Sequence, residues 1–305
     1  MFANVIVGVD GSQSGREAVK LAFALAPEGG RITLAHVYGG AQLPGEGTQR
    51  RSTREGARER SQLLLQGERD ATGVDAELIS WCASSVGRGL HTLAEREGGD
   101  LLVVGSHRRG LAGRVLVGEN TRASLNGAPC AVAVAPSGYV ARSGGFLRIG
   151  VGYDFSPESR AALAVARALA ARDAAKLRAL HVMSVAAWGV LAPLPANWGD
   201  IVENDRRAAE TKLSALEGVD ATAVYGVASE ELAAFGDRVD LLVVGSRSYG
   251  PLRRLLFGST SSALARHARC ALLVLPRTAA SAGPGGRSGV DQLAVERVAD
   301  QLGAR

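Results

Sequence analysis

The sequence contains two copies of one pattern, and this duplication limits the possible folds more than any other feature. The heptapeptide Asp100-Leu-Leu-Val-Val-Gly-Ser106 recurs unchanged as Asp240-Leu-Leu-Val-Val-Gly-Ser246. Residues 128–136 recur with changes as 268–276, and both repeats are displaced by 140 residues. Solenoid repeats are much shorter, about 20–50 residues. The repeat therefore predicts two domains of one fold.

Each copy alternates short apolar runs with longer amphipathic stretches. The runs end at Gly, Asp or Pro and are too short for helices, so they predict strands buried on both faces. In the first copy they are Val5–Val9, Ile32–Val37, roughly Val74–Ser80, Leu101–Val104 and Ala131–Ala135. Strands that alternate with helices predict right-handed crossovers and a parallel sheet. The fold class is α/β, with two tandem doubly wound domains, each a five-stranded parallel sheet with helices on both faces.

Polar residues mark the expected helix starts. Ser14-Gly-Arg-Glu17 has the capping-box pattern. In the second copy, Ser156 precedes Pro157, a cap residue followed by proline at the first helical position. Both patterns predict a helix directly after the first strand of each copy.

Glycine and proline set the expected domain boundaries. The first domain spans 1–137 and the second spans 146–277, with Gly and Pro residues between them. Residues 278–305 are expected to form a linker and a short C-terminal helix with an apolar face. This helix is either a docking segment or a frayed tail.

Composition argues against several classes of protein. A net charge of +5 over 305 residues is too small to indicate nucleic-acid binding. Three cysteines with no CxxC pair indicate neither a disulfide framework nor a zinc site. No apolar run approaches the ~20 residues that span a bilayer, and the start has no basic signal-peptide pattern. We expect a cytoplasmic protein without membrane or nucleic-acid partners, and without a metal site.

A candidate anion site follows the repeated strand of the second copy. Gly245 opens a loop that closes on Gly258, and the polar run from Ser259 through Thr260 and Ser261 leads into a predicted helix. Free N–H groups at a helix start, aligned with the helix dipole, attract anions. Gly258 lets a phosphate approach the backbone, and the three hydroxyl groups are hydrogen-bond donors.

At this point the sequence resembles the universal stress protein (UspA-type) family, in particular its tandem two-domain members. The resemblance covers both copies. ATP-binding members carry Gly-x2-Gly-x9-Gly-Ser/Thr here, which aligns with Gly245, Ser248, Gly258 and Ser259. Two further marks of the family are an Asp after the first strand and a His-Val pair that ends the second. The resemblance implies ATP as ligand, with or without Mg.

The resemblance also assigns roles to individual residues. It implies that the Asp lies beside the ribose and adenine and that the Val borders the adenine. The expected nucleotide-binding residues of the second copy are Asp154, Val182, Gly245, Ser248, Gly258, Ser259, Thr260 and Ser261; those of the first copy are Asp10, Val37, Gly105 and Gly118.

The first copy departs further from the motif than the second. It has Arg108 at the second glycine position and Glu119 at the hydroxyl position, whereas the second copy changes only one glycine, to Ser248. Our hypothesis is that Glu119 itself occupies the anion site, with Arg108 as its partner. On this hypothesis the second copy is the better nucleotide binder.

Structural roles compete with binding roles at several positions. Asp10 and Asp154 fit either ligand contacts or turn-capping residues. His36 and His181 fit hydrogen-bonded strand-end residues better than ligands, and no residue is expected to be catalytic.

Three functions fit the sequence. The first is a cytoplasmic stress regulator that binds adenine nucleotide without fast turnover. The second is an interaction module independent of nucleotide. The third is a slow ATPase, although the Walker phosphate loop and the dinucleotide fingerprint are both missing from the sequence. The resemblance implies that the two domains pair through their last strands, 131–135 and 271–275, and a homodimer is a further expected assembly.

Overall fold

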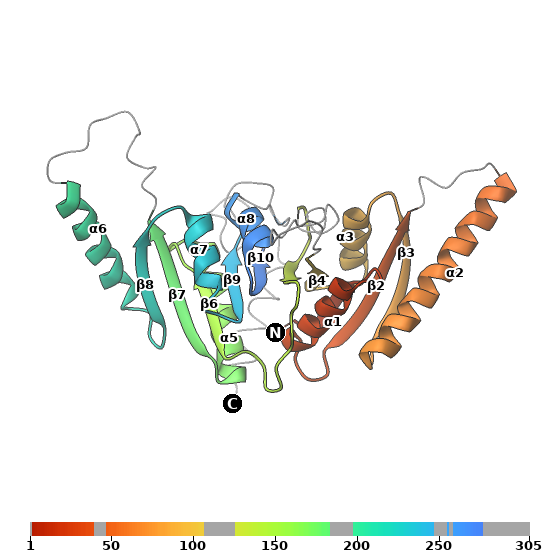
Figure 1. Cartoon of the computed structure of the whole chain (residues 1–305), viewed down its shortest axis with the longest axis horizontal. Helices are drawn as coiled ribbons and strands as arrows, with labels where there is room; N and C mark the ends of the chain where they lie inside the picture. The colour runs from red at the N-terminus through yellow and green to blue at the C-terminus, as the bar shows by residue number, and fades with distance from the viewer. Residues whose placement is uncertain are drawn as a thin grey trace, which may run out of the picture.

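A computed structural model describes residues 2–39, 47–106, 126–183, 198–246, 255 and 259–276. Its elements form one ten-stranded sheet with helices on both faces (Figure 1). The strand order is β3-β2-β1-β4-β5-β10-β9-β6-β7-β8. None of the described helices is long and apolar enough to cross a membrane.

The first half of the chain supplies one side of this sheet, and every strand pair within the half is parallel. Its strands are β1 (Asn4–Gly8), β2 (Arg31–Gly39), β3 (Glu77–Ala83), β4 (Leu101–Gly105) and β5 (Ala131–Ala135). Its described helices are α1 (Gln13–Leu25), α2 (Gly47–Thr72) and α3 (Val86–Arg96).

The second half repeats this arrangement in parallel strands of its own. Its strands are β6 (Arg148–Gly152), β7 (Lys176–Met183), β8 (Asp220–Tyr225), β9 (Leu241–Gly245) and β10 (Ala271–Leu275). Its described helices are α5 (Pro157–Asp173), α6 (Trp198–Leu213), α7 (Ala228–Gly236) and α8 (Ser259–His267). The predicted α/β class and the five parallel strands in each copy are confirmed.

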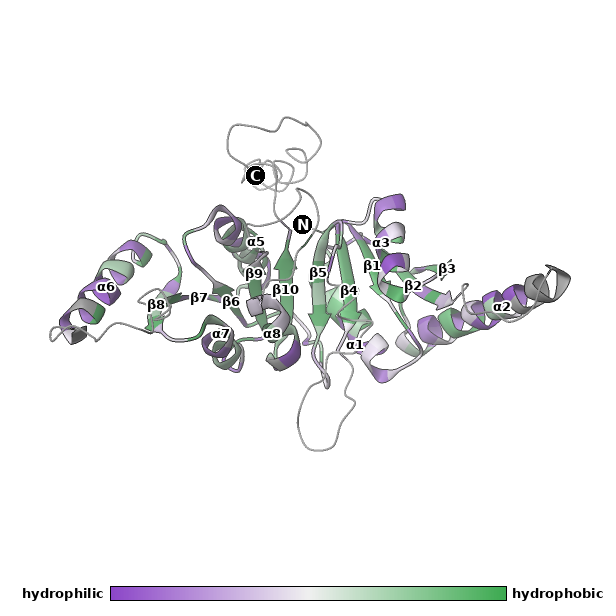
Figure 2. Ribbon diagram, turned by 90° about the horizontal axis from the view of Figure 1, so that it is seen from above, coloured by the Kyte–Doolittle hydropathy of each residue, from purple (hydrophilic) through white to green (hydrophobic). Residues whose placement is uncertain are grey.

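The last strands of the two halves lie side by side at the centre of the sheet (Figure 2). Here β5 and β10 pair antiparallel, with Leu272 opposite Val134 and Val274 opposite Val132. Both strands are buried along their whole length, because helices cover the sheet here on both faces. The family resemblance implied pairing through these two segments, and the two strands do pair within the chain.

Two apolar layers cover the sheet. One layer holds α1, α5 and residues of α2 and α6, and it is continuous across the two halves, from Leu21 and Leu25 in α1 to Leu169 in α5. The opposite layer holds α3, α7 and α8. Strand residues contribute to the two layers alternately, which explains the short, uninterrupted apolar runs in the sequence.

The helix α5 also clamps the halves together by hydrogen bonds. The Arg172 guanidinium donates to the backbone oxygens of Ala24 (2.6 Å) and Ala26 (3.2 Å), at the end of α1. Asp173 accepts from Arg172 (2.5 Å) and from the Phe146 N–H (2.9 Å) in the segment between the halves. Cations near helix carbonyl ends are favourable, because the helix dipole is negative there.

The third strand was placed wrongly by sequence. It was predicted at Val74–Ser80 but runs from Glu77 to Ala83. Gly73, with φ of 66°, ends α2, and the next residues connect the helix to the sheet. The register pairs Thr33 with Glu77 and Gly39 with Ala83, so β2 sets where β3 begins and ends.

The first helix cap was also wrong. The cap is Ser12, whose hydroxyl oxygen accepts from the Gly15 N–H at 3.4 Å, and the helix begins at Gln13. Glu17 closes no capping box; it is buried and accepts from the Gly138 N–H at 2.8 Å. The predicted cap Ser156, followed by Pro157, is confirmed.

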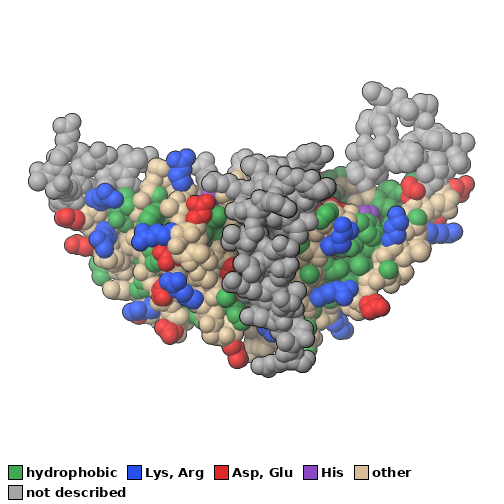
Figure 3. Space-filling view, turned by 180° about the vertical axis from the view of Figure 1, so that it is seen from behind, with side chains coloured by type: hydrophobic (Ala, Val, Ile, Leu, Met, Phe, Trp, Pro, Cys, Tyr) green, Lys and Arg blue, Asp and Glu red, His purple; other side chains and the backbone are tan. Residues whose placement is uncertain are grey.

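Charged side chains of both signs are mixed over the described surface seen from behind (Figure 3). Several form ion pairs between neighbouring elements, such as Arg31 with Glu77 and Arg178 with Asp220. Such exposed pairs contribute about 0–1 kcal/mol each. They indicate a solvated surface rather than a single-signed binding face.

Candidate functional site

The strand order creates one switch point in each half. In the first half, β1 lies between β2 and β4, and in the second half β6 lies between β7 and β9. In each half, the second and third strands lie on one side of the first strand, and the fourth and fifth strands lie on its other side. Ligands of open parallel sheets bind at such points, outside the carboxyl ends of the strands. The residues at these ends are Asp10 and Ser106 in one half, and Asp154 and Ser246 in the other.

The two aspartates adopt the same hydrogen-bonded turn. In the first half, Asp10 Oδ1 accepts from the Ser12 N–H at 3.1 Å and from its hydroxyl at 2.5 Å. In the second half, Asp154 Oδ1 accepts from the Ser156 N–H at 3.1 Å and from its hydroxyl at 2.5 Å. The capping interpretation of both aspartates thus has direct support.

The turn has a cost in the second half. Its middle residue takes φ of 80° at Gly11 but 62° at Phe155, a bulky residue that rarely adopts this conformation. The Phe155 ring packs edge-on against His181 (4.9 Å between centroids) and Tyr153 (5.2 Å). This aromatic packing offsets the backbone strain and fixes the loop that carries Asp154.

Asp154 is held as a carboxylate. Burial raises its pKa, but hydrogen bonds from the Ser156 and Ser159 hydroxyls outweigh burial, and the pKa is lower than usual. A fixed negative acceptor at this place suits a ligand hydroxyl group and opposes a bare phosphate.

Glycines at the strand ends allow the loops to come close. A Cβ on Gly105 would lie 2.0 Å from the backbone oxygen of Ser14, and a Cβ on Gly245 would lie 2.8 Å from the Cβ of Glu158. The first turns of α1 and α5 thus rest directly on the ends of β4 and β9.

Two buried hydroxyl groups at this edge have no partner among the described residues. Ser106 is 3% exposed and Ser246 is 4% exposed, and neither Oγ makes a hydrogen bond there. Their N–H groups continue the sheet ladder, donating to Ala135 and Leu275 at 2.9 Å. The side chains therefore point to the face covered by α3, α7 and α8. Buried polar groups almost always find a partner, and none of the described residues supplies one to either hydroxyl.

The valines share this face. Val37 is 8% exposed and packs closely on Gly89 of α3. Val182 is partly buried, against the α7 and α8 layer. The preceding histidines are hydrogen-bonded through Nδ1, His36 to the Ser61 hydroxyl and His181 to the Tyr153 carbonyl, both at 2.8 Å. The interpretation of the histidines as strand-end residues fits these bonds.

The predicted helix start after the phosphate loop is present. The helix α8 begins at Ser259, and no acidic residue lies in its first turn. Ser259 is exposed, Thr260 is partly buried and Ser261 is buried. The other expected residues of the loops lie outside the described residues: Ser248, Gly258, Arg108, Gly118 and Glu119.

The two buried cysteines are not reactive thiols. Cys130 and Cys270 are buried, and burial raises the pKa of each thiol to about 12, so both behave as small core residues. No cluster of His, Cys, Asp or Glu suited to a metal ion occurs within the described ranges.

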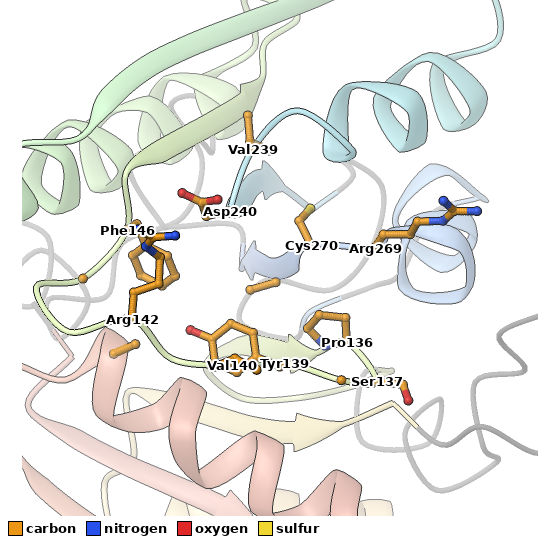
Figure 4. A pocket seen from close by; sticks show the side chains of 14 residues that line it. Pro136, Ser137, Tyr139, Val140, Arg142, Phe146, Val239, Asp240, Arg269 and Cys270 are labelled. Atoms are coloured by element: carbon orange, nitrogen blue, oxygen red, sulfur yellow. The ribbon is translucent and has the colours of Figure 1, made fainter.

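A separate pocket lies at the junction of the two halves (Figure 4). It has a volume of about 210 Å³ and is lined by the connecting segment 136–146 and by residues before β9 and β10, such as Asp240 and Cys270. Burial and the nearby Asp240 and Asp173 raise the pKa of Tyr139 to about 12. The pocket faces the amino ends of β9 and β10, opposite the edge that carries Ser246.

Two features of this edge were not predicted from the sequence. Ser156 was predicted as a helix cap, but neither it nor Ser12 was predicted to hold an aspartate through its hydroxyl. Ser106 and Ser246, whose hydroxyls have no partner among the described residues, were not singled out. The signal was available, since Ser106 and Ser246 end the repeated heptapeptide.

Comparisons with known proteins agree with this fold. The family described as "Universal stress protein family" matches residues 1–136 and 145–276. A universal stress protein of Mycolicibacterium smegmatis is 28% identical over 292 residues, covering 89% of this chain and 96% of that protein. One of Thermus aquaticus is 30% identical over 143 residues, covering 43% of this chain and 98% of that protein.

A solved structure extends the likeness to the whole fold. The crystal structure of a universal stress protein from Archaeoglobus fulgidus has a TM-score of 0.64 at 20% identity, covering 91% of this chain and 99% of that one. Since the family matches both halves and most of the chain, this chain belongs to the universal stress protein family, with two such domains in tandem.

Proposed function

We propose that this chain is a cytoplasmic regulator that binds ATP in its second half without rapid turnover. The observation that carries the proposal is the second switch point. Here the fixed Asp154 carboxylate lies at the same sheet edge as Gly245 and Ser246, whose hydroxyl has no partner among the described residues. A ligand with both hydroxyl groups and an anionic tail matches this edge.

The proposal assigns a part of the nucleotide to each group. Asp154 accepts from the ribose hydroxyls, and Val182 contacts the adenine. The phosphates meet the loop that begins at Gly245 and the start of α8. The start of α8 has hydroxyl side chains and no acidic residue in its first turn, and the N-terminus of a helix attracts anions. The loop residues Ser248 and Gly258 and the helix residues Ser259, Thr260 and Ser261 complete this set, and Mg²⁺ would accompany the phosphates.

A binding function fits this edge better than catalysis. Asp154 is a poor general base, because its lowered pKa makes it weakly basic and the Ser156 hydroxyl already occupies one oxygen. Slow hydrolysis of bound ATP by an ordered water is the most that this arrangement supports.

Calorimetric titration with ATP and Mg²⁺ tests the proposal. The wild-type chain should bind ATP once, and Gly258→Glu should abolish binding by placing a carboxylate at the phosphate loop. Asp154→Ala should weaken binding by at least tenfold, whereas the matched Asp10→Ala should leave ATP affinity unchanged. Failure of millimolar ATP to bind or to raise the melting temperature would refute the proposal.

The second candidate function is an interaction module that works without nucleotide. One observation favours it: β5 and β10 already pair within the chain, so the two domains form a single unit without any ligand. A homodimer of this unit would need a different surface. Retention of in-cell partners by Gly258→Glu, together with absence of co-purifying nucleotide from the wild type, would support this candidate.

A further inference from the structure

The pocket at the junction of the two halves takes no part in the proposed function. It lies at the amino ends of β9 and β10, at the opposite edge of the sheet from Ser246. Its volume of about 210 Å³ is below the ~300–1,000 Å³ of sites for drug-sized molecules, so it suits a smaller metabolite. Ligand sites are commonly apolar pockets in which a few polar groups converge.

Three polar side chains lie at one end of this pocket (Figure 4). They are Asp240, which precedes β9, and Tyr139 and Arg142 from the connecting segment 136–146. Arg269 also lines the pocket, but its side chain points away from these three (Figure 4). The polar groups of the pocket are thus gathered at one end.

Asp240 brings a fixed negative charge to this end. Its carboxylate accepts from the N–H groups of Leu147 and Arg148, both at 2.9 Å, and from the Arg148 guanidinium at 2.8 Å. Burial raises its pKa, but these hydrogen bonds outweigh burial, and the pKa is lower than usual. The side chain is still 21% exposed, so it remains accessible from the pocket.

The connecting segment supplies a hydroxyl group and a positive charge. Burial, together with Asp240 and Asp173, raises the pKa of Tyr139 to about 12, so its hydroxyl keeps the proton and can both donate and accept. Arg142 is exposed, and its guanidinium forms no ion pair within the described part of the chain. A simple anion at this end would be repelled by Asp240, and a simple cation by Arg142.

The rest of the pocket is apolar. Its lining includes Ala24, Pro136, Val239 and Cys270, and the buried thiol of Cys270 is uncharged because burial raises its pKa to about 12. The pocket therefore suits a small molecule with charges of both signs at one end and an apolar group at the other.

We propose that the junction pocket binds a zwitterionic amino acid with an apolar side chain, such as leucine. Arg142 contacts the carboxylate, and Asp240 and the Tyr139 oxygen accept from the ammonium group. The side chain packs on the apolar lining.

The bound amino acid would join the two halves through the connecting segment. This segment is tied to the first half by the Gly138 N–H, which donates to Glu17 at 2.8 Å. It is tied to the second half by the Phe146 N–H, which donates to Asp173 at 2.9 Å. A ligand that binds only the folded chain raises its melting temperature, so leucine should stabilise the full chain.

Amide chemical-shift titration of the full chain with leucine tests this assignment. We expect shifts along 136–146 and at Asp240, together with a higher melting temperature. Two analogues serve as controls: 4-methylpentanoate lacks the ammonium group, and 3-methylbutylamine lacks the carboxylate. Each should bind at least about tenfold more weakly than leucine, because hydrogen bonds to charged groups contribute about this factor. Failure of millimolar leucine to shift these amides, or equal binding of either analogue, would overturn the proposal.

Two matched arginine variants locate the carboxylate. Arg142→Gln should raise the leucine Kd about tenfold without weakening 3-methylbutylamine, whereas Arg269→Gln should change neither affinity. Both arginines are exposed, so neither variant should lower the melting temperature of the free chain. Equal effects of the two variants on leucine, or no effect of Arg142→Gln, would overturn the proposal.

Discussion

Substitution of Gly105 tests how closely the first turn of α1, which follows Asp10, must pack on the end of β4. In Gly105→Ala the new methyl group would lie 2.0 Å from the backbone oxygen of Ser14, although real Cβ contacts under 3.0 Å essentially do not occur. The obstacle is backbone rather than a flexible side chain, so the first turn of α1 must move by about 1 Å. That movement disturbs the Ser12 cap and the packing of α1.

The expected loss can be estimated from these two effects. Overpacking in a core costs about 1–3 kcal/mol, and loss of a helix cap costs about 1 kcal/mol. We therefore expect Gly105→Ala to lower the free energy of unfolding by about 3 kcal/mol. At ~2–4 °C for each kcal/mol, the melting temperature should fall by about 6–12 °C.

Urea denaturation of matched glycine variants measures this effect. Gly245→Ala meets Glu158 at 2.8 Å and should cost less than Gly105→Ala. Gly39→Ala meets no atom within 4 Å and is the neutral control, while Gly67→Ala, inside α2 and equally free of contacts, should stabilise the chain by about 0.5–1 kcal/mol. The reasoning fails if Gly105→Ala is as stable as Gly39→Ala, or more stable than Gly245→Ala.

Two further predictions concern the histidine beside α2 and the clamp between the halves. Burial lowers the pKa of His36, and nearby Asp10 opposes this only in part, so the folded chain binds fewer protons than the unfolded chain. Stability should therefore fall as pH drops through 6.5. In His36→Gln the urea midpoint should fall less between pH 7 and pH 5 than it does in the wild type. An equal fall in both proteins would show that His36 is not the cause. Arg172→Ala removes two bonds to α1 carbonyls and leaves the buried Asp173 without its cation. It should cost about 2–3 kcal/mol in urea denaturation, with Arg172→Lys intermediate; a loss under about 0.5 kcal/mol would exclude the clamp.

The duplication and the strand periodicity made most of the fold predictable, because short apolar runs between amphipathic stretches leave few alternatives to a parallel sheet. The third strand was misplaced because Val74 and Ala76 are apolar enough to resemble a strand, whereas pairing with β2 decides the register. The first cap was misassigned because Ser12 and Ser14 both suit a cap. The contact that decides between them, Glu17 with Gly138, joins residues far apart in the sequence.

Local geometry was predictable where it depends on neighbours in sequence, as for the turns made by the aspartates that follow the first strands. The clamp of Arg172 was not, because its acceptors are backbone oxygens in the other half, which no side-chain pattern reports. Hydrogen-bond satisfaction of Ser106 and Ser246 likewise depends on which atoms surround them in space.

The repeated heptapeptide shows how packing and binding can be separated. Asp100 and Asp240 each accept backbone N–H groups at the start of the neighbouring strand, Ala3 and Asn4 in one half, Leu147 and Arg148 in the other. The four apolar residues of each copy are 0–5% exposed. Each glycine lets the first turn of a helix, α1 or α5, pack directly on the end of the strand. Structure therefore accounts for every residue of the heptapeptide except its final serine. Neither serine hydroxyl has a partner among the described residues, and a buried hydroxyl without a partner costs stability relative to alanine, so packing of the described residues does not explain the serine in either half.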